Sequence, residues 1–227
     1  MQTHTAQTPP PRPFVPHPAD EVMFASRLRA YDQLFERLAL VPLGNRTILD
    51  AGCGNGKFLD ICCRRWGAVE THCIGTDKRA DVWEAWHAAH PETGIRFVQQ
   101  HSEDMDFLPD SFDIVHQSML LSSVTDEWLR TATTTAMWRA LRPGGFLISY
   151  DFWLNPTNHR ASGIRASTLR QLFPEGRLRY LKSLTLAPPL CRPLHVLGTP
   201  PLLALESLRV LNTHLLVALE KPGGAAA

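Results

Sequence analysis

Apolar residues follow two alternating patterns along the chain. In the first, they recur every three or four positions, as Tyr31, Leu34 and Leu38 do between residues 19 and 40, which is typical of a helix with one buried face. In the second, short apolar runs are rich in β-branched residues, which indicates strands. The helical pattern covers residues 19–40, the stretch from the glycine loop to 65, 80–90, 128–141 and 167–173. The strand pattern covers 46–50, 70–77, 95–99, 112–117, 146–152, 177–186 and 213–219.

Strands that alternate with helices predict an α/β fold, a parallel sheet with helices on both faces. The 227 residues, 44% of them hydrophobic, suit one domain with a sizeable core. We expect that domain to cover 19–221. Residues 1–18 are rich in proline and threonine and predict a disordered tail, and 222–227 predict a loose end.

Charge and cysteine content exclude several classes of function. A net charge of +1 and the lack of a basic cluster disfavour nucleic acid as a partner. No signal peptide or membrane span is visible, and five cysteines without regular spacing predict reduced thiols in the cytoplasm. The spacing predicts no metal site, because adjacent cysteines at 62 and 63 cannot both ligate one metal comfortably.

The most informative segment is a glycine loop between a predicted strand and a predicted helix. Asp50 ends the strand, and Gly52, Gly54 and Gly56 follow at alternate positions. Glycines let a ligand approach the backbone closely, but a carboxylate in front of the loop repels a phosphate and suits a ligand ammonium. Asp77, about 20 residues further on, is where ribose hydroxyls are bound in such folds. The loop therefore favours a nucleoside that carries an amino acid.

With these motifs, residues 46–150 resemble the class I S-adenosylmethionine-dependent methyltransferases. The resemblance rests on 48–59, on 69–77, on 112–115 and on Leu-Arg-Pro-Gly-Gly-Phe-Leu at 141–147, in the family's order. It implies a Rossmann-like, seven-stranded, mostly parallel sheet whose antiparallel last strand lies beside the fifth. It also implies S-adenosyl-L-methionine as cofactor, converted to S-adenosyl-L-homocysteine. The residues that the resemblance assigns to cofactor binding are Asp50, Ala51, Gly52, Cys53, Gly54, Gly56, Asp77, Lys78, His101, Ser102, Glu103, Met105 and Gln117.

The chain departs from the family where adenine is bound. His101 stands at the position of the family's aspartate in Gly-Asp-Ala. A neutral imidazole can accept from the adenine amino group, and Glu103 or Asp104 can do the same. The alternative is that backbone and apolar contacts alone hold the ring, with Met105 packed on it. Nearby, Gln117 is expected to face the methionine part, whereas the neighbouring histidine at 116 is interpreted as a satisfied strand residue.

In the resembled topology, segments 152–166 and 187–212 both lie over the site, and we interpret them as acceptor pocket and lid. A core-filling or contact role for 187–212 is the alternative. The candidate catalytic residues are Asp151, His214 and His159, with Asp151 and His214 as a base and its orienting partner. The structural alternatives are that Asp151 caps a helix or pairs Arg165 and that His214 packs. Polar acceptor contacts are expected from Asn155, Asn158, Arg160 and Arg165.

These features predict a methyltransferase that acts on a small-molecule acceptor, with oxygen as the favoured methylated atom. A weaker resemblance beyond residue 151 is to a bacterial subgroup of glycan and secondary-metabolite pathways. A catalytically silent S-adenosylmethionine-binding partner subunit is the alternative, since His101 departs from the pattern. A dinucleotide oxidoreductase is disfavoured by the loop spacing. A homodimer stays open, and stable membrane insertion is not expected.

Overall fold

The computed structural model describes residues 18–154, 163–187, 191, 193–194, 199–209 and 211–223. The helices are α1 (Pro18–Arg37), α2 (Lys57–Trp66), α3 (Ala80–Ala89), α4 (Leu120–Ser123), α5 (Glu127–Ala140), α6 (Ala166–Leu172) and α8 (Thr199–Ser207). The strands are β1 (Ile48–Ala51), β2 (Cys73–Asp77), β3 (Arg96–Gln99), β4 (Phe112–Ser118), β5 (Leu141–Phe152), β6 (Arg177–Leu186) and β7 (Asn212–Glu220). Short 3-10 turns lie at Leu43–Asn45, Glu70–His72 and Ser102–Asp104.

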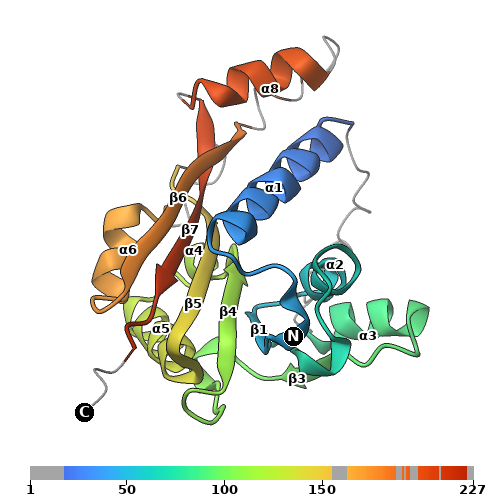
Figure 1. Ribbon diagram of the computed structural model, residues 1–227, viewed down its shortest axis with the longest axis vertical. Coiled ribbons are helices and arrows are strands. Elements are labelled where there is room, and N and C mark those ends of the chain that lie inside the picture. The colour runs from blue at the N-terminus through green and yellow to red at the C-terminus, as the bar shows by residue number, and fades with distance from the viewer. Residues whose placement is uncertain are drawn as a thin grey trace, which may run out of the picture.

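One seven-stranded sheet in the order β3-β2-β1-β4-β5-β7-β6 organises these elements (Figure 1). Strands β1 to β5 pair in parallel, and β7 runs antiparallel between β5 and β6. The strand order reverses between β1 and β4, which opens a crevice at the carboxyl ends of these strands. The predicted fold class, including the antiparallel last strand beside the fifth, is confirmed.

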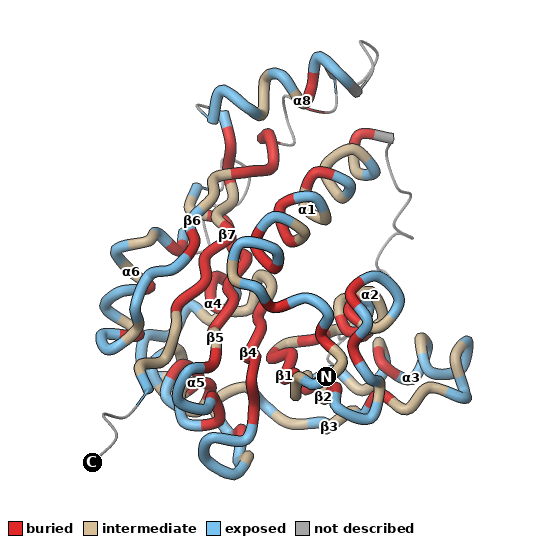
Figure 2. The backbone as a smooth tube through the Cα atoms, in the orientation of Figure 1, coloured by how far each residue is buried: buried red, intermediate tan, exposed pale blue. Residues whose placement is uncertain are grey.

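Both faces of the sheet are buried because neighbouring strand residues alternate between two cores. Ile48 of β1 and Ile114 of β4 pack with helices α1, α2 and α3, whereas Leu49 and Val115 pack with α4, α5 and α6. Figure 2 shows the central strands as nearly continuous buried runs. This double burial is the usual condition of a parallel sheet, and it leaves the strand ends as the place for a site.

Strand β5 begins at Leu141, five residues before the predicted strand at 146. Leu141 already pairs with Phe112, and the register shifts before Ile114 pairs with Phe146. The Arg-Pro-Gly-Gly turn is thus part of strand β5, where it produces an irregularity in the pairing with β4. The Gly144 amide donates to Lys221 O at 2.8 Å, which satisfies the backbone there.

Two short helices of the C-terminal half lie outside the segments with a helical pattern in the sequence. Helix α4 follows β4 directly and has no counterpart in the hydrophobic pattern, because four residues carry no period. Helix α8 lies beyond the ends of β6 and β7, beside the start of α1 (Figure 1). Leu202 of α8 packs with Ala19 of α1 and with Leu186 of β6. Within the described residues, no helix is long and apolar enough to cross a membrane.

Candidate functional site

The glycine loop joins β1 to α2 at the carboxyl edge of the sheet. The amides of Gly52 and Cys53 donate to Thr76 O of β2 at 2.8 and 3.0 Å, which ties the loop to the neighbouring strand. Gly56 has φ 72°, in the left-handed region, and a Cβ there would lie 2.6 Å from the Trp83 ring. Glycine is therefore required at position 56 both by backbone conformation and by packing.

Asp77, at the end of β2, organises the loop's other side. Its Oδ2 accepts from the Gly54 amide at 2.9 Å, and its Oδ1 accepts from the Arg79 amide at 2.9 Å. Each carboxylate oxygen has a second lone pair, so both can still accept from ligand hydroxyls. The prediction that Asp77 faces a ribose remains open and fits this geometry.

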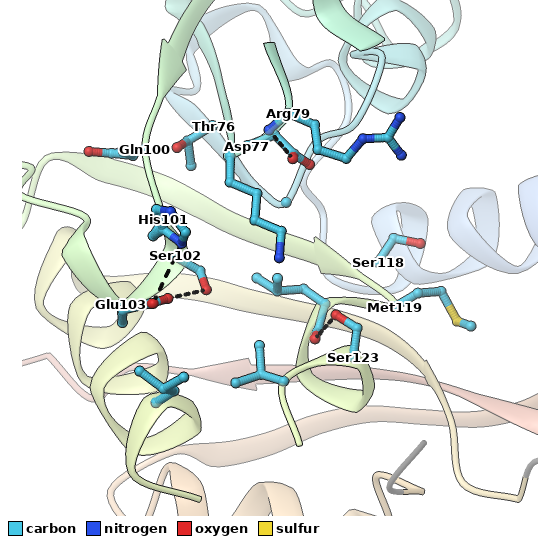
Figure 3. A pocket seen from close by; sticks show the side chains of 15 residues that line it. Thr76, Asp77, Arg79, Gln100, His101, Ser102, Glu103, Ser118, Met119 and Ser123 are labelled. Atoms are coloured by element: carbon cyan, nitrogen blue, oxygen red, sulfur yellow. Dashed lines mark hydrogen bonds and ion pairs between the residues drawn. The ribbon is translucent and has the colours of Figure 1, made fainter. Parts of the chain in front are cut away.

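Asp77 faces a cavity of about 670 Å³. Figure 3 shows Thr76 and Asp77 on one side, His101, Ser102 and Glu103 on a second, and Ser118, Met119 and Ser123 across from them. The lining residues are Gly52, Thr76, Asp77, Lys78, Arg79, Gln100, His101, Ser102, Glu103, Ser118, Met119, Leu120, Ser123, Val124 and Leu129. Most of the residues predicted from the glycine loop to Glu103 thus meet at one hollow.

Two polar atoms in this wall lack a partner among the described residues. The Thr76 hydroxyl and the Gln100 side-chain nitrogen are buried and form no hydrogen bond within that part of the chain. Buried polar groups are normally paired, so these two atoms suit a polar ligand. His101 exposes 61% of its side chain and lies 3.7 Å from Glu103, while Ser102 hydrogen-bonds Thr133 at 3.0 Å. The cavity therefore fits a nucleoside with polar edges.

Asp50 lies beneath the loop in a buried hydrogen-bond chain. His116 Nδ1 is 2.7 Å from Asp50 Oδ1, and His116 Nε2 is 2.7 Å from the Tyr31 hydroxyl of α1. Phe58 stacks on the imidazole with ring centroids 3.5 Å apart. The interpretation of His116 as a satisfied strand histidine agrees with these contacts. They also connect α1 to the residue that precedes the glycines.

Besides Asp50 and the loop glycines Gly54 and Gly56, four predicted cofactor residues lie outside the cavity wall. Ala51 is buried at the end of β1, and the Cys53 thiol packs against Gly75, with its pKa raised by burial. Met105 belongs to the core around α5. Gln117 is buried, and its Oε1 accepts from the Leu120 amide at 2.9 Å, so that side chain supports α4. A cofactor contact from any of these four stays a prediction.

Asp151 is 1% exposed and holds helix α4 in place. Its Oδ2 accepts from the Ser122 amide of α4 at 3.1 Å, and its Oδ1 accepts from the Phe152 amide at 2.9 Å. Burial raises its pKa to about 6 against these hydrogen bonds, which favour the charged form. The helix-capping role named above as an alternative for Asp151 is therefore what the structure contains.

His214, at the start of β7, has a defined tautomer. The Thr213 hydroxyl donates to Thr185 O at 3.2 Å and lies 2.9 Å from His214 Nδ1. A hydroxyl carries one hydrogen, so Nδ1 must be the donor in the second contact and Nε2 is left as an acceptor. Burial, with a smaller effect of Arg27, lowers the pKa of His214 to about 4, so the ring is neutral near pH 7.

The expected pairing of Asp151 with His214 is not formed. Across the β5–β7 ladder Asp151 lies opposite Leu215, whereas His214 lies opposite Phe152. Because successive side chains alternate between faces, the two point to opposite sides of the sheet. The third candidate, His159, and the acceptor contacts Asn155, Asn158 and Arg160 lie outside the described residues.

His214 instead lines a second cavity of about 530 Å³ that the sequence reasoning missed. Its wall consists of Asp20, Glu21, Met23, Phe24, Arg27, Lys57, Met119, Tyr150, Thr185 and His214. Met119 lines both cavities, so they adjoin each other. The described residues of 152–166 and 187–212 line neither cavity, so a lid role for those segments stays a prediction. The pattern that could have indicated this wall is the polar face of the first helix.

Two residues of the second cavity have left-handed backbones without being glycine. Met119 has φ 62° and Thr185 has φ 64°. A β-branched residue such as Thr185 rarely adopts this conformation. Its amide donates to Glu206 of α8 at 3.2 Å and its hydroxyl contacts the Tyr150 hydroxyl at 2.8 Å. Such strain is typical of residues that the surrounding structure holds at a functional site.

Comparison with known proteins agrees with this geometry. Residues 48–145 match the family model described as a methyltransferase domain. An uncharacterized methyltransferase of Mycobacterium sp. (strain KMS) is 30% identical over 122 residues, 53% of this chain and 45% of the relative. A ubiquinone biosynthesis O-methyltransferase of Alkalilimnicola ehrlichii is 30% identical over 135 residues, 59% of this chain and 53% of the relative. The chain thus spans about half the length of these curated relatives.

A solved structure extends the likeness to most of the fold. The S-adenosylmethionine-dependent methyltransferase of Mesorhizobium loti superposes with a TM-score of 0.61 at 19% identity, covering 83% of this chain and 97% of the other. Residues 48–145 therefore match the methyltransferase-domain family, and the fold is that of an S-adenosylmethionine-dependent methyltransferase.

Proposed function

We propose that the protein transfers a methyl group from S-adenosylmethionine to an oxygen atom of a small-molecule acceptor. The observation that carries this proposal is the junction of the two cavities at Met119. On one side lie the glycine loop and Asp77, and on the other lies an imidazole with a free acceptor nitrogen. When bound, the cofactor supplies an electrophilic methyl group on a sulfonium.

The residues of the first cavity fit the cofactor. Asp77 would accept from the ribose hydroxyls, and Thr76 with Gln100 offers unpaired polar atoms in the same wall. His101 or Glu103 would face the adenine edge. Asp50, already oriented by His116, would favour the ammonium of the amino-acid part, because a carboxylate in front of the loop attracts a cation. These residues bind and orient, which is most of what such a displacement needs.

His214 is the general base of choice among the three candidates. Its Nε2 can accept a proton from an acceptor hydroxyl, and Nδ1 is fixed by the Thr213 hydroxyl at 2.9 Å. Asp151 is 1% exposed and lines neither cavity, so its carboxylate does not reach an acceptor bound in either cavity. A low pKa makes the imidazole a weak but fully available base at neutral pH.

The test is transfer of labelled methyl from S-adenosylmethionine into small molecules of a cell extract, with wild type, Asp77→Asn and His214→Gln. We expect a labelled organic product with wild type. For Asp77→Asn we expect weaker S-adenosylhomocysteine binding. His214→Gln should bind normally but transfer roughly 10²-fold more slowly, the usual size of a lost base. Tight binding without any labelled product would favour the silent partner subunit, and label in macromolecules would contradict a small-molecule acceptor.

A further inference from the structure

The wall of the second cavity has an aromatic inner part. The Tyr150 and His214 rings stack with centroids 5.0 Å apart and planes 12° apart, and Phe152 meets the His214 edge at 6.1 Å. Phe24 and Met23 of α1 and Met119 complete the apolar surface. Stacked rings and thioethers favour a flat apolar ligand over a sugar.

Two cations lie over the same aromatic ring at this cavity. The Arg27 guanidinium carbon is 5.2 Å from the Phe24 centroid and 5.1 Å from that of Tyr150. Lys57 Nζ, at the start of α2, is 4.2 Å from the Phe24 centroid. Two like charges at one ring are unfavourable until an anion joins them.

The acids of the wall lie at its other end. Asp20 and Glu21 belong to the first turn of α1. Arg27 follows Glu21 by six residues, roughly 9 Å along the helix axis. Arg27 is also close enough to Tyr150 and His214 to lower the pKa of each group. Arg27 therefore lies at the inner end of the cavity, beside the candidate base, about 9 Å along helix α1 from the acids at the outer end.

An anion at the inner end would also help the cofactor. S-adenosylmethionine has a net charge of +1, because its sulfonium and ammonium outnumber its single carboxylate, and this charge would add to those of Arg27 and Lys57. A negatively charged acceptor group reduces the repulsion among these charges. Its charge would then be needed for tight assembly of the reacting pair.

We propose that the second cavity binds an aromatic acceptor that carries a carboxylate, with the ring among Phe24, Tyr150 and Met119 and the carboxylate between Arg27 and Lys57. This inference rests on the proposed function and narrows its acceptor to hydroxylated aromatic acids. Arg27 and Lys57 are the specificity-determining residues. His214 lines the same cavity, and its Nε2 would accept the hydroxyl proton.

The test is calorimetric binding of a panel of mono- and dihydroxybenzoates and hydroxycinnamates, each beside its methyl ester, to the full chain saturated with S-adenosylhomocysteine. With wild type, at least one acid should bind about tenfold or more tightly than its ester, the usual effect of a charged hydrogen bond. Arg27→Gln and Lys57→Gln should each remove most of that preference. Arg29→Gln is the matched control, because Arg29 is exposed on the same helix and lines neither cavity.

Arg27→Lys keeps the charge and should keep part of the preference, which separates loss of charge from loss of folding. Affinity for S-adenosylhomocysteine itself should change less than about twofold in every variant. The inference is wrong if no acid in the panel binds more tightly than its ester. It is also wrong if Arg27→Gln weakens S-adenosylhomocysteine as much as it weakens the acid, because the cations would then hold the cofactor's own carboxylate.

The outcomes for the inference and for the proposed function are distinct. Acid-selective binding without methyl transfer to any acceptor would leave the cavity assignment standing and contradict the enzyme proposal. Methyl transfer at rates that do not depend on a carboxylate in the acceptor, in wild type as in Arg27→Gln, would support the enzyme proposal and contradict the cavity assignment.

Discussion

Asp151 and His214 should change the stability of the folded protein in opposite directions as the pH rises. Replacing either residue should therefore make the pH dependence caused by the other one measurable. Burial raises the pKa of Asp151 to about 6, so the folded state holds that proton more tightly than the unfolded chain does. Stability from Asp151 is therefore present at acid pH and lost as the pH rises through 6. Burial lowers the pKa of His214 to about 4, so the folded state resists protonation there. Its cost to stability is largest at acid pH and disappears as the pH rises.

These directions can be turned into magnitudes for two convenient conditions. With ordinary pKa values of 3.8 for Asp151 and 6.5 for His214, linkage gives a loss of about 1.4 kcal/mol from Asp151 between pH 5 and 7.5. Over the same interval His214 contributes a gain of about 1.9 kcal/mol. The two nearly cancel in the wild type, leaving a net gain of roughly 0.5 kcal/mol from this pair.

The assay is urea unfolding, followed by tryptophan fluorescence, at pH 5 and pH 7.5 and constant ionic strength. Relative to wild type, Asp151→Asn should gain about 1.4 kcal/mol on going to the higher pH, and His214→Gln should lose about 1.9 kcal/mol. Each variant has a constant packing cost that cancels in this comparison. If the difference between variant and wild type is the same at both pH values, neither group titrates as its burial requires and the reasoning is refuted.

Two further predictions concern the loop and the first helix. Gly56→Ala should destabilise the protein by about 2–4 kcal/mol, because the new Cβ would stand on a left-handed backbone and lie 2.6 Å from the Trp83 ring. Gly54→Ala is the control and should cost only about 1 kcal/mol, because its Cβ meets open space. Equal losses of stability in thermal unfolding would show that the Trp83 ring moves freely aside. Tyr31→Phe should lower the free energy of unfolding by about 1–3 kcal/mol, because it leaves His116 Nε2 buried without its partner. It should also weaken S-adenosylhomocysteine binding, measured by calorimetry. Unchanged binding would mean that the hydrogen-bond chain from Tyr31 to Asp50 is structural only.

The glycine loop and the alternation of strands and helices were predictable because local chemistry and connectivity determine them, whereas the place of the last strand beside the fifth was implied by the family resemblance. The site in such folds lies at the carboxyl edge of the parallel sheet. A carboxylate, three alternate glycines and a second carboxylate at the ends of two strands indicate that edge. The strand at 177–186 was also correctly bounded, since its alternation ends in a turn-rich segment.

The second cavity was not predictable because it depends on register and on helix placement. Residue spacing did not show that His214 lies opposite Phe152, so the sequence suggested a partnership with Asp151 that the pleat forbids. Helix α4, which occupies the Asp151 carboxylate, is too short to leave a periodic signal. The left-handed Thr185 gives no sign in the sequence, since tertiary contacts impose that conformation.

Helix α1 carries Phe24 and Arg27, the acceptor contacts proposed above, and, one turn later, the anchoring Tyr31. The anchor and the recognition face are thus distinct residues on one element that precedes the glycine loop in the chain. Substrate range can therefore be re-engineered by exchanging the turns before Tyr31 while the nucleoside machinery of β1, β2 and β4 is left untouched. A library confined to positions 20, 23, 24 and 27 would diversify acceptors without rebuilding the catalyst.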